Sequence, residues 1–527
     1  MTVKTDMTFT SIPDVLEKRA SASPEREFLY LDDHWVTYGG LLSAARRFAT
    51  FALAEGLTSG DRVGIMLDNQ DELLAAWFGT CRIGAIEVPL NTALRHTQLE
   101  YVLGNCDMRI LVIGAEYLSR LEDISLPRAL RVVVVGDTKG QTPPSRGVSW
   151  SSAVDDSSPD PEELPPLDVT LSSPAAIIYT SGTTGPSKGV VCPHGHLMAL
   201  GSHTLDLLEC GPGDVLYDAH PLFHAHSQGQ AVLAAMLADI PLIMRRKFSA
   251  SRFIEDIVEF DVTVAYLIGA AGLVLKQPDR PEFRKHKLRL VCAVPIPKGE
   301  RAALEDKFGV PVIDLYGMSE MGVISSNRLN RRVDGSCGAA TPFRDVQIVD
   351  EDGCPLPAGE VGEILVRSND PWTTFREYWG MPDQTLATLQ NMWFHTGDTG
   401  RMDEQGNIFF VGRIKDSIRR RGENISAFEV EQVINSHPSV LESAVLPYPS
   451  PVGEDDVWAV IVTIPGEKVL AGELAEFFED RLPRFSKPRY LQFETALPKT
   501  PTERIEKYKL RDRGLAKDAV DLEAGTA

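Results

Sequence analysis

One short segment combines glycine, hydroxyl and lysine residues in the way that phosphate binding requires. Thr180-Ser-Gly-Thr-Thr-Gly-Pro-Ser-Lys188 directly follows the apolar run Ala175–Tyr179. Glycines let backbone N–H groups approach an anion closely, hydroxyls add donors, and Lys188 adds positive charge. Because Gly189 follows Lys188, the spacing is not that of P-loop NTPases, and the Mg²⁺-binding hydroxyl must lie elsewhere. We expect a nucleotide-phosphate site formed by Thr180, Ser181, Gly182, Thr183, Thr184, Gly185 and Lys188.

The elements that must position this loop alternate between helix-like and strand-like patterns. Expected helices cover 11–22, 38–56 and 71–84, and expected strands cover 61–67, 85–89, 111–113, 132–135, 175–179 and 288–292. Such alternation is typical of an α/β fold with a largely parallel sheet. The stretch 136–174 is rich in Pro, Ser and Asp, and we expect a surface connection with little regular structure.

The chain has 527 residues, which is too long for one ordinary core. Composition changes near Gly412. Beyond it, helices are expected at 427–436 and 471–482, and strands at 443–446 and 457–464. We expect a large N-terminal α/β domain with mostly parallel sheets over residues 1–413. A small mobile C-terminal α+β domain would cover residues 414–527.

Composition narrows the possible partners and the compartment. A net charge of −21 argues against nucleic acid and anionic membranes as partners. The seven scattered cysteines form no Cys-x-x-Cys pair, which argues against a zinc site or a disulfide framework and favours a reducing, cytoplasmic setting. The N-terminus has no apolar signal-peptide run. A homodimer is the default expectation for oligomeric state.

Several further motifs follow the glycine-rich loop in a fixed order, and together they resemble the adenylate-forming superfamily. That superfamily includes acyl-CoA synthetases, peptide-synthetase adenylation domains and luciferase. The resemblance covers nearly the whole chain and is nearest to bacterial carnitine/crotonobetaine-type acyl-CoA ligases. The motifs are Val88-Pro-Leu-Asn91, Pro221-Leu-Phe-His224, Tyr316-Gly-Met-Ser-Glu320, Gly359-Glu-Val-Gly-Glu363, Trp393-Phe-His-Thr-Gly-Asp398, Gly412-Arg-Ile-Lys-Asp416 and Arg421-Gly-Glu-Asn-Ile-Ser426.

The resemblance implies roles in ATP binding for particular residues. Thr180 and Glu320 would hold Mg²⁺, for which a hydroxyl and a carboxylate are suitable ligands. Tyr316 would stack on adenine, and Asp398 and Arg413 would contact the ribose. Ser319 and Thr184 would donate to phosphate oxygens. The implied nucleotide site also includes Gly317 and Met318.

The resemblance also implies an acyl pocket, a hinge and a coenzyme A site. Lys415 falls at the hinge about which the small domain alternates between two arrangements. Arg420, Arg421 and Gly422 lie beside it, either as a solvated charged face or as contacts to coenzyme A phosphates. His224 would gate the acyl pocket; a metal role for His224 and His226 is rejected because no third ligand is in sight. The pocket candidates are His224, Ser227, Ala270, Val294, Gly317, Met318 and Val323.

The chain departs from the family pattern near its C-terminus. The family lysine that bridges carboxylate and phosphate is replaced by Arg504 in Pro498-Lys-Thr-Pro-Thr-Glu-Arg-Ile505. Arg504 can supply the same charge, although it is bulkier and planar. Alternatively, Lys507 substitutes for it, or the first half-reaction is impaired. Glu320 and His224 complete the expected catalytic set.

The expected reaction is ATP-dependent formation of an acyl-adenylate, followed by acyl transfer to coenzyme A. Two negative reactants must meet, so positioning and charge neutralisation would carry the catalysis. The altered C-terminal segment and the bulky residues around Val294 leave open an amine or other nitrogen nucleophile as acceptor. A non-catalytic nucleotide-binding protein is the third alternative, against which Lys188, Glu320, Asp398 and Arg413 speak.

Overall fold

The computed structural model describes residues 8–31, 33–141, 143–144, 146–154, 164–166, 168–180, 187–294, 296, 300–414, 417–420, 423–450, 454–467, 469–499 and 505–524. These residues fall into two compact units. Unit 1 lies within Met1–Thr180, Ser187–Asp345 and Arg367–Ala387; unit 2 takes in Val346–Val366 and the chain from Thr388 onward. The domain boundary expected at 413/414 stays a prediction. The mixed α/β class, with mostly parallel sheets in the large N-terminal part, is confirmed.

The first sheet of unit 1 has eight strands in the order β20-β9-β8-β4-β3-β5-β6-β7. Strands β3 to β8 run parallel where they pair, whereas β9 is antiparallel to β8 and to β20. The central strands are mostly apolar on both faces, as sheets covered on both sides require, and the fully buried Glu87 of β4 is an exception. Their bounds are β3 Arg62–Met66, β4 Ile86–Pro89, β5 Ile110–Gly114, β6 Arg131–Val135, β7 Gly147–Ser149, β8 Pro174–Thr180, β9 Lys188–Pro193 and β20 Glu377–Tyr378.

The second sheet of unit 1 has the order β14-β13-β12-β10-β11-β1-β2 and is parallel except for the β1–β2 hairpin. A short antiparallel sheet, β15-β16-β17, follows it in the chain. The bounds are β1 Glu27–Leu31, β2 His34–Thr37, β10 Leu216–Asp218, β11 Leu242–Met244, β12 Val264–Ile268, β13 Leu290–Val294, β14 Val312–Ile313, β15 Leu315–Met318, β16 Gly322–Ser326 and β17 Ala339–Ala340.

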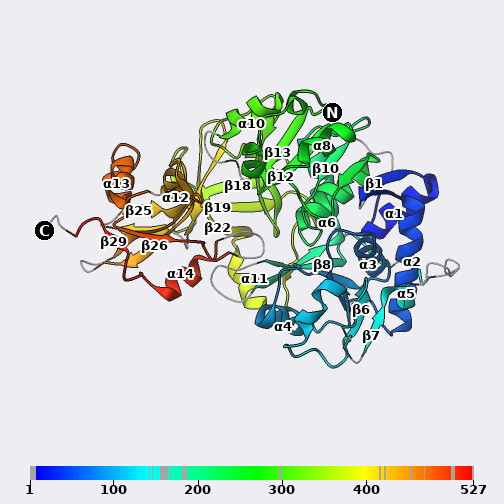
Figure 1. Cartoon of the computed structure of the whole chain (residues 1–527). Helices are drawn as coiled ribbons and strands as arrows, with labels where there is room; N and C mark the ends of the chain where they lie inside the picture. The colour runs from blue at the N-terminus through cyan, green and yellow to red at the C-terminus, as the bar shows by residue number, and fades with distance from the viewer. Residues whose placement is uncertain are drawn as a thin grey trace. The chain divides into compact units, whose positions relative to one another are not determined.

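Helices cover the two large sheets of unit 1 (Figure 1). Capping fixes where the early helices begin: Ser11 accepts from the Asp14 N–H, and Thr37 accepts from the Gly40 N–H. The bounds are α1 Ile12–Ala22, α2 Tyr38–Ala54, α3 Asp71–Arg82, α4 His96–Asn105, η1 Ala115–Leu121, α5 Trp150–Ala153, α6 His194–Leu207, α7 Ala234–Ala238, α8 Phe253–Glu259, α9 Ala271–Leu275, η3 Pro281–Arg284, α10 Glu300–Phe308 and α11 Pro382–Thr388.

A π-helix, η2, covers His226–Leu233 and leads directly into α7. It packs against α6 with very close backbone contact. A Cβ on Gly229 would lie 2.5 Å from Cβ of Leu200, and one on Gly201 would lie 2.9 Å from the backbone N of Ala234. Glycine at both positions therefore lets the two helices meet.

Unit 2 is built on antiparallel strands and a separate four-stranded sheet. Strands β18, β19, β22 and β21 form one sheet, in which β23 also pairs with β22, and β24 pairs with β25. The four-stranded sheet has the order β26-β27-β28-β29. The bounds are β18 Arg344–Val349, β19 Val361–Ser368, β21 Leu389–Gln390, β22 Trp393–Met402, β23 Ile408–Arg413, β24 Ser417–Arg420, β25 Glu423–Ser426, α12 Ala427–Asn435, β26 Val440–Pro449, β27 Asp455–Thr463, α13 Ala471–Glu479, η5 Arg484–Ser486, β28 Tyr490–Glu494, α14 Lys507–Arg513 and β29 Val520–Asp521.

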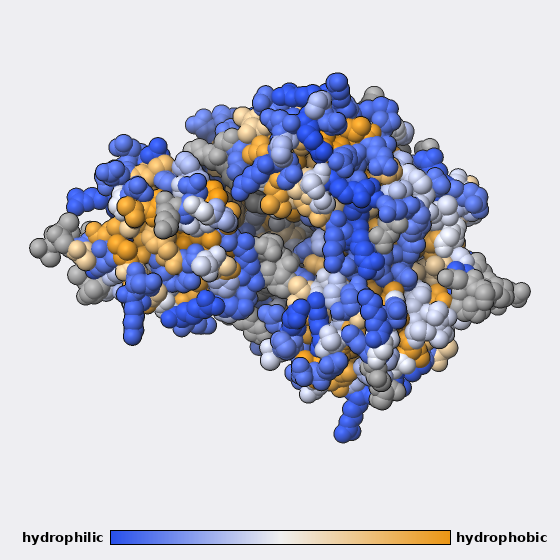
Figure 2. Space-filling view, in the orientation of Figure 1, coloured by the Kyte–Doolittle hydropathy of each residue, from blue (hydrophilic) through white to orange (hydrophobic). Residues whose placement is uncertain are grey.

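We expected little regular structure in the stretch 136–174, but its described residues include β7 and α5. Strand β7 continues the parallel sheet by pairing with β6. Polar residues cover much of the face in Figure 2, as the charged composition suggests. In the part of the chain that the structure describes, helices are too short or too polar to cross a membrane.

Candidate active site

The phosphate-binding segment is held at both ends by the first sheet. Thr180, the last residue of β8, pairs with Lys188, the first residue of β9, and the two strands are antiparallel. The hydroxyl of Thr180 lies 3.5 Å from the backbone oxygen of Lys188. Ser181, Gly182, Thr183, Thr184 and Gly185 lie outside the described residues. The structure thus brings Thr180 and Lys188 together at the end of a hairpin.

A tyrosine joins Lys188 to Glu320. The Lys188 ammonium lies 4.5 Å from the centre of the Tyr378 ring, within the range of a cation–π contact. The Tyr378 hydroxyl donates to Oε1 of Glu320 at 2.8 Å. Burial raises the pKa of Tyr378 far above its usual range, and the Glu320 carboxylate raises it further, so the phenol remains a donor. One side chain therefore contacts both the predicted phosphate-binding cation and the predicted metal-binding carboxylate.

Tyr316, Gly317 and Met318 lie in β15, and Ser319 and Glu320 lie in the turn that leads to β16. The hairpin is unusually tight at Gly317: a Cβ there would lie 2.5 Å from the backbone oxygen of Gly322. Gly322 itself has a φ of 69°, which glycine adopts without strain. The sequence Tyr-Gly-Met-Ser-Glu therefore needs its glycine to form the turn that presents Glu320.

Two buried basic side chains, His196 and Arg344, contact backbone oxygens of this turn. Nε2 of His196, on α6, lies 2.8 Å from the oxygen of Ser319, and Nε of Arg344 donates to the oxygen of Met321 at 2.8 Å. Both side chains also contact the oxygen of Thr373, at 2.9 Å from His196 and 2.6 Å from Arg344. Burial lowers the pKa of His196 to about 4 and that of Arg344 to about 10. Burial thus opposes the charge of His196, whereas its contacts with two backbone oxygens favour that charge; Arg344 keeps its charge at pH 7.

The acyl-pocket candidates lie in unit 1, and three of them lie at or after the carboxyl ends of neighbouring parallel strands. His224 follows β10, Ala270 follows β12, and Val294 ends β13. The Gly269 N–H donates to the oxygen of Val294 at 2.6 Å, which ties two of these ends together. Ligands of open α/β sheets bind at such ends. Ser227, Met318 and Val323 come from η2, β15 and β16, and Ser227 is fully buried.

In unit 2, Asp398 and Arg413 are direct partners across two antiparallel strands. They pair between β22 and β23, and Nε of Arg413 lies 3.4 Å from Oδ1 of Asp398. Asp398 is only 5% exposed, whereas the Arg413 side chain is 40% exposed. The pair thus presents a carboxylate and a guanidinium side by side, as the predicted ribose contacts require.

Glu363 explains why two of the sequence motifs occur together. Its Oε1 accepts from the Gly397 N–H at 3.0 Å, and its Oε2 lies 2.8 Å from Nδ1 of His395. Gly397 has a φ of 69°. Thr396 accepts from the Asp398 N–H at 3.0 Å. Glu363 therefore fixes the turn of the Trp393–Asp398 motif from the neighbouring strand, β19.

The C-terminal candidates are already engaged within unit 2. Arg420 is 3% exposed and contacts Oδ1 of Asp456 at 3.0 Å and Oε1 of Glu523 at 2.8 Å. Lys507, at the start of α14, forms a 2.8 Å ion pair with Glu431. A contact between Arg420 and coenzyme A stays a prediction, as does catalysis by Lys507. Lys415, Arg421, Gly422 and Arg504 lie outside the described residues.

Sequence reasoning missed Tyr378, His196 and Arg344. Tyr378 lies in a two-residue strand, which carries no periodicity. His196 follows a Pro-His-Gly sequence that reads as an ordinary helix start, and Arg344 reads as an exposed cation. Their partners are distant in the chain, so only the fold reveals them.

Comparisons with known proteins assign the chain to a family. Residues 16–379 match the model of the AMP-binding enzyme family, and residues 429–504 match that of the AMP-binding enzyme C-terminal domain. The chain belongs to the AMP-binding enzyme family.

Two sequence relatives of this chain are CoA ligases. The crotonobetaine/carnitine–CoA ligase of Salmonella typhi is 31% identical over 483 residues, covering 90% of this chain and 93% of its own. The same enzyme of Citrobacter koseri is 32% identical over 486 residues, with the same coverage.

Solved structures of similar proteins include ligases with a bound adenylate. The anthranilate CoA ligase AuaEII in complex with anthranoyl-AMP has a TM-score of 0.85 at 25% identity, covering 96% of this chain and 98% of its own. The o-succinylbenzoate CoA synthetase of Bacillus subtilis in complex with its acyl-adenylate has a TM-score of 0.83 at 25% identity, covering 97% and 99%.

Proposed function

We propose that this protein is an AMP-forming acid–CoA ligase. It uses ATP to convert a carboxylic acid to an acyl-adenylate with release of pyrophosphate, and then transfers the acyl group to coenzyme A. Membership of the AMP-binding enzyme family supports this function, as do relatives that are CoA ligases and similar structures that hold acyl-adenylates. The observation that carries it is that Tyr378 contacts both Glu320 and Lys188, the strand partner of Thr180.

The proposed first step brings a carboxylate to the α-phosphorus of ATP, so the site must offset two negative reactants. Lys188 supplies a fixed positive charge beside the phosphate-binding segment. Thr180 and Glu320 offer a hydroxyl and a carboxylate, the hard oxygen ligands that suit Mg²⁺. The ion would neutralise phosphate charge when bound. We further propose that Tyr316 stacks on the adenine and that Asp398 and Arg413 bind the ribose, because these two residues are paired side by side.

We propose Arg504, rather than Lys507, as the cation that the C-terminal segment supplies to adenylation. The Lys507 ammonium is held by Glu431 at 2.8 Å, and its side chain is only 16% exposed, so moving it would break an established ion pair. Arg504→Ala should lower the rate of pyrophosphate exchange far more than Lys507→Gln, while transfer from supplied acyl-adenylate to coenzyme A stays near wild type. Arg504→Lys should restore part of the exchange rate. Equal exchange rates in Arg504→Ala and wild type would contradict this assignment.

The acid and the acceptor are tested together. Pyrophosphate release is measured over a panel that includes aliphatic, aromatic and zwitterionic acids, with crotonobetaine and anthranilate among them because relatives act on these classes. Each acid is tested with and without coenzyme A, and products are identified by mass. Acyl-CoA formation supports the proposal, whereas adenylate that accumulates until an amine is added would favour an amide-forming ligase. No release with any acid would contradict both.

A cytoplasmic location and a homodimer stay proposals. Fractionation of the source cells tests the first, and light scattering of the purified protein tests the second.

A further inference from the structure

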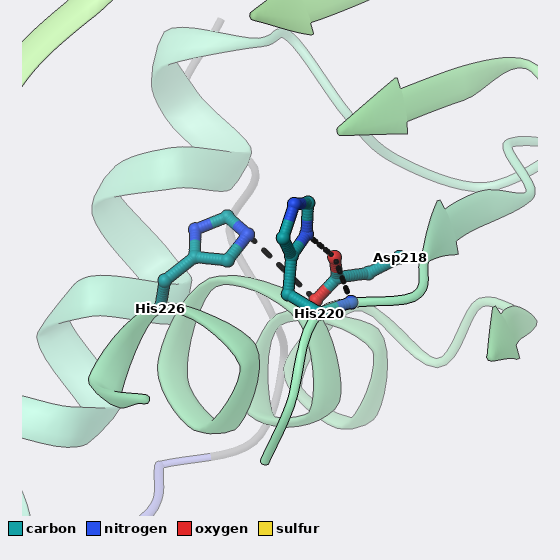
Figure 3. A group of neighbouring side chains, drawn as sticks. All are labelled: Asp218, His220 and His226. Carbon is teal, nitrogen blue, oxygen red and sulfur yellow. Dashed lines mark hydrogen bonds and ion pairs between the residues drawn. The ribbon is translucent and has the colours of Figure 1, made fainter. Parts of the chain in front are cut away.

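Three side chains outside the proposed nucleotide site meet at one point of unit 1. Asp218 ends β10, His220 follows it, and His226 begins η2 (Figure 3). One ligand-type atom from each lies within 4.8 Å of the other two. Asp218 is fully buried, and the side chains of His220 and His226 are only 13% and 15% exposed. The spacing of His224 and His226 in the sequence did not indicate that Asp218 and His220 lie near His226.

In each histidine, the ring nitrogen that faces away from Asp218 donates a hydrogen bond to another residue of the protein. Nε2 of His220 donates to the oxygen of Ile268 at 2.6 Å. Nδ1 of His226 donates to Oε1 of Gln230 at 2.7 Å. In a neutral imidazole, one nitrogen carries the proton and the other carries a lone pair. Nε2 of His226 therefore presents a lone pair toward Asp218, whereas Nδ1 of His220 shares a proton with the Asp218 carboxylate in a short contact. Histidines that bind metals are oriented by outer hydrogen bonds of this kind.

The carboxylate of Asp218 has one engaged oxygen and one available oxygen. Its Oδ1 accepts from the His220 N–H at 3.1 Å and makes a short contact with Nδ1 of the same residue. Among the described residues, neither the buried Oδ2 of Asp218 nor the buried Nε2 of His226 has a hydrogen-bond partner. These two atoms lie 3.7 Å apart, which is too long for a hydrogen bond. A buried carboxylate oxygen that faces a lone pair is unfavourable unless positive charge lies between the two atoms.

We propose that Asp218, His220 and His226 bind a divalent transition-metal ion, with Zn²⁺ as the best match. Two ligands at about 2.0–2.1 Å from a tetrahedral zinc ion lie about 3.4 Å apart, close to the observed separation of Oδ2 and Nε2. Imidazole and carboxylate ligands suit zinc and its first-row neighbours better than Mg²⁺. Three protein ligands leave a fourth position for water. Binding requires that the ion replace the proton in the contact between Asp218 and His220.

The site ties together both ends of the segment 219–225. Asp218 and His220 lie at its start, His226 lies directly after it, and His224 lies between them. An ion would hold the carboxyl end of β10 and the start of η2 in one arrangement. Its effect on the acyl pocket rests on the proposed function, but metal binding itself does not.

The test uses the full-length protein without an affinity tag, after chelator treatment and dialysis. Zn²⁺ is titrated by calorimetry in the absence of acid, ATP, Mg²⁺ and coenzyme A, and Co²⁺ is added to a second sample to record its visible d–d bands. We expect one equivalent of each ion to bind, with band intensities typical of four-coordinate cobalt. Failure here would leave the ligase assay unaffected, so the two proposals fail separately.

Variants locate the ion. His226→Gln and Asp218→Asn should abolish or greatly weaken binding, and Gln230→Leu should weaken it by about 10- to 100-fold through loss of the outer hydrogen bond. His34→Gln, at a surface histidine in β2, is the matched control and should bind like wild type. Gln230→Leu keeps the test decisive if a ligand variant fails to fold. Absence of stoichiometric binding, or equal affinity in wild type and Gln230→Leu, would overturn the proposal in favour of a purely hydrogen-bonded triad.

Discussion

The contact between Tyr378 and Glu320 offers a sharp test of how this site is organised. Tyr378→Phe removes one hydroxyl and keeps the ring on which Lys188 lies. A hydrogen bond to a charged group contributes about 1.5–3 kcal/mol. At about 1.36 kcal/mol per tenfold in rate, loss of the whole contribution in the transition state corresponds to about a 10- to 150-fold lower kcat/KM. The upper value applies if Glu320 holds its productive orientation only through this bond.

Tyr378→Leu is the companion variant, because it removes both the hydroxyl and the aromatic face. A cation–π contact adds about 0.5–2 kcal/mol, so the leucine variant should be slower than the phenylalanine variant by a further factor of about two to thirty. Pyrophosphate exchange measures the step, and Mg²⁺ titration shows whether the loss lies in metal binding. Thermal unfolding of all three proteins serves as the control for folding.

Two results would refute the reasoning. Wild-type exchange by Tyr378→Phe would mean that the hydroxyl does not orient Glu320. Equal exchange rates for the phenylalanine and leucine variants would mean that the cation–π contact with Lys188 does not contribute to catalysis. A rate loss in Tyr378→Phe that matches a loss of folded protein would instead assign the bond to stability.

The remaining predictions concern stability and local geometry. Burial lowers the pKa values of His194, His196 and His203 to about 4, 4 and 3, below the usual value near 6.5. The folded protein therefore binds fewer protons than the unfolded chain, and each histidine should cost about 1.4 kcal/mol of stability when the pH falls from 7.5 to 5.5, measured by denaturant unfolding. Gly317→Ala places a Cβ 2.5 Å from a backbone oxygen, so adenylation should fall at least about tenfold in the folded fraction, whereas wild-type kinetics would show that the hairpin can relax. Glu363→Gln keeps the shape but removes the charge that accepts from the Gly397 N–H, so KM for ATP should rise several-fold with little change in melting temperature; an unchanged KM would separate this turn from nucleotide binding.

Local patterns were sufficient to predict much of the fold. Runs such as Val132–Val135 and Ala175–Tyr179 are apolar on both faces and became β6 and β8, because covered parallel strands need no polar face. The helix from Ser11 was predicted within one residue, since Ser11 caps it. The strand β7 was missed because its three residues gain their order from pairing with β6 rather than from their own sequence.

The candidate site was predictable only where a motif carried it. Asp398 and Arg413 belong to separate motifs, and the structure pairs them across adjacent strands. The contact of Lys188 with Tyr378 joins residues that lie 190 positions apart, and no periodic pattern encodes it. The group around Asp218 was hidden for a related reason: its members come from a strand end, a connecting segment and a π-helix. Which nitrogen of a histidine faces inward depends on tertiary acceptors, and these do not appear in a linear sequence.

Because His226 begins the π-helix η2, the place of its side chain depends on the number of residues in η2 as well as on their identity. A π-helix closes its hydrogen bonds over one residue more than an α-helix does, and such segments are rare and frequently occur at functional sites. Deletion of any single residue between Gln228 and Leu233 would let the segment rewind as a regular α-helix. The same residue types would remain, but the deletion would rotate His226 away from Asp218 or shift α7 along α6. The position of His226 relative to Asp218 therefore depends on the number of residues in η2. A related chain with a one-residue gap here would lack this arrangement of side chains.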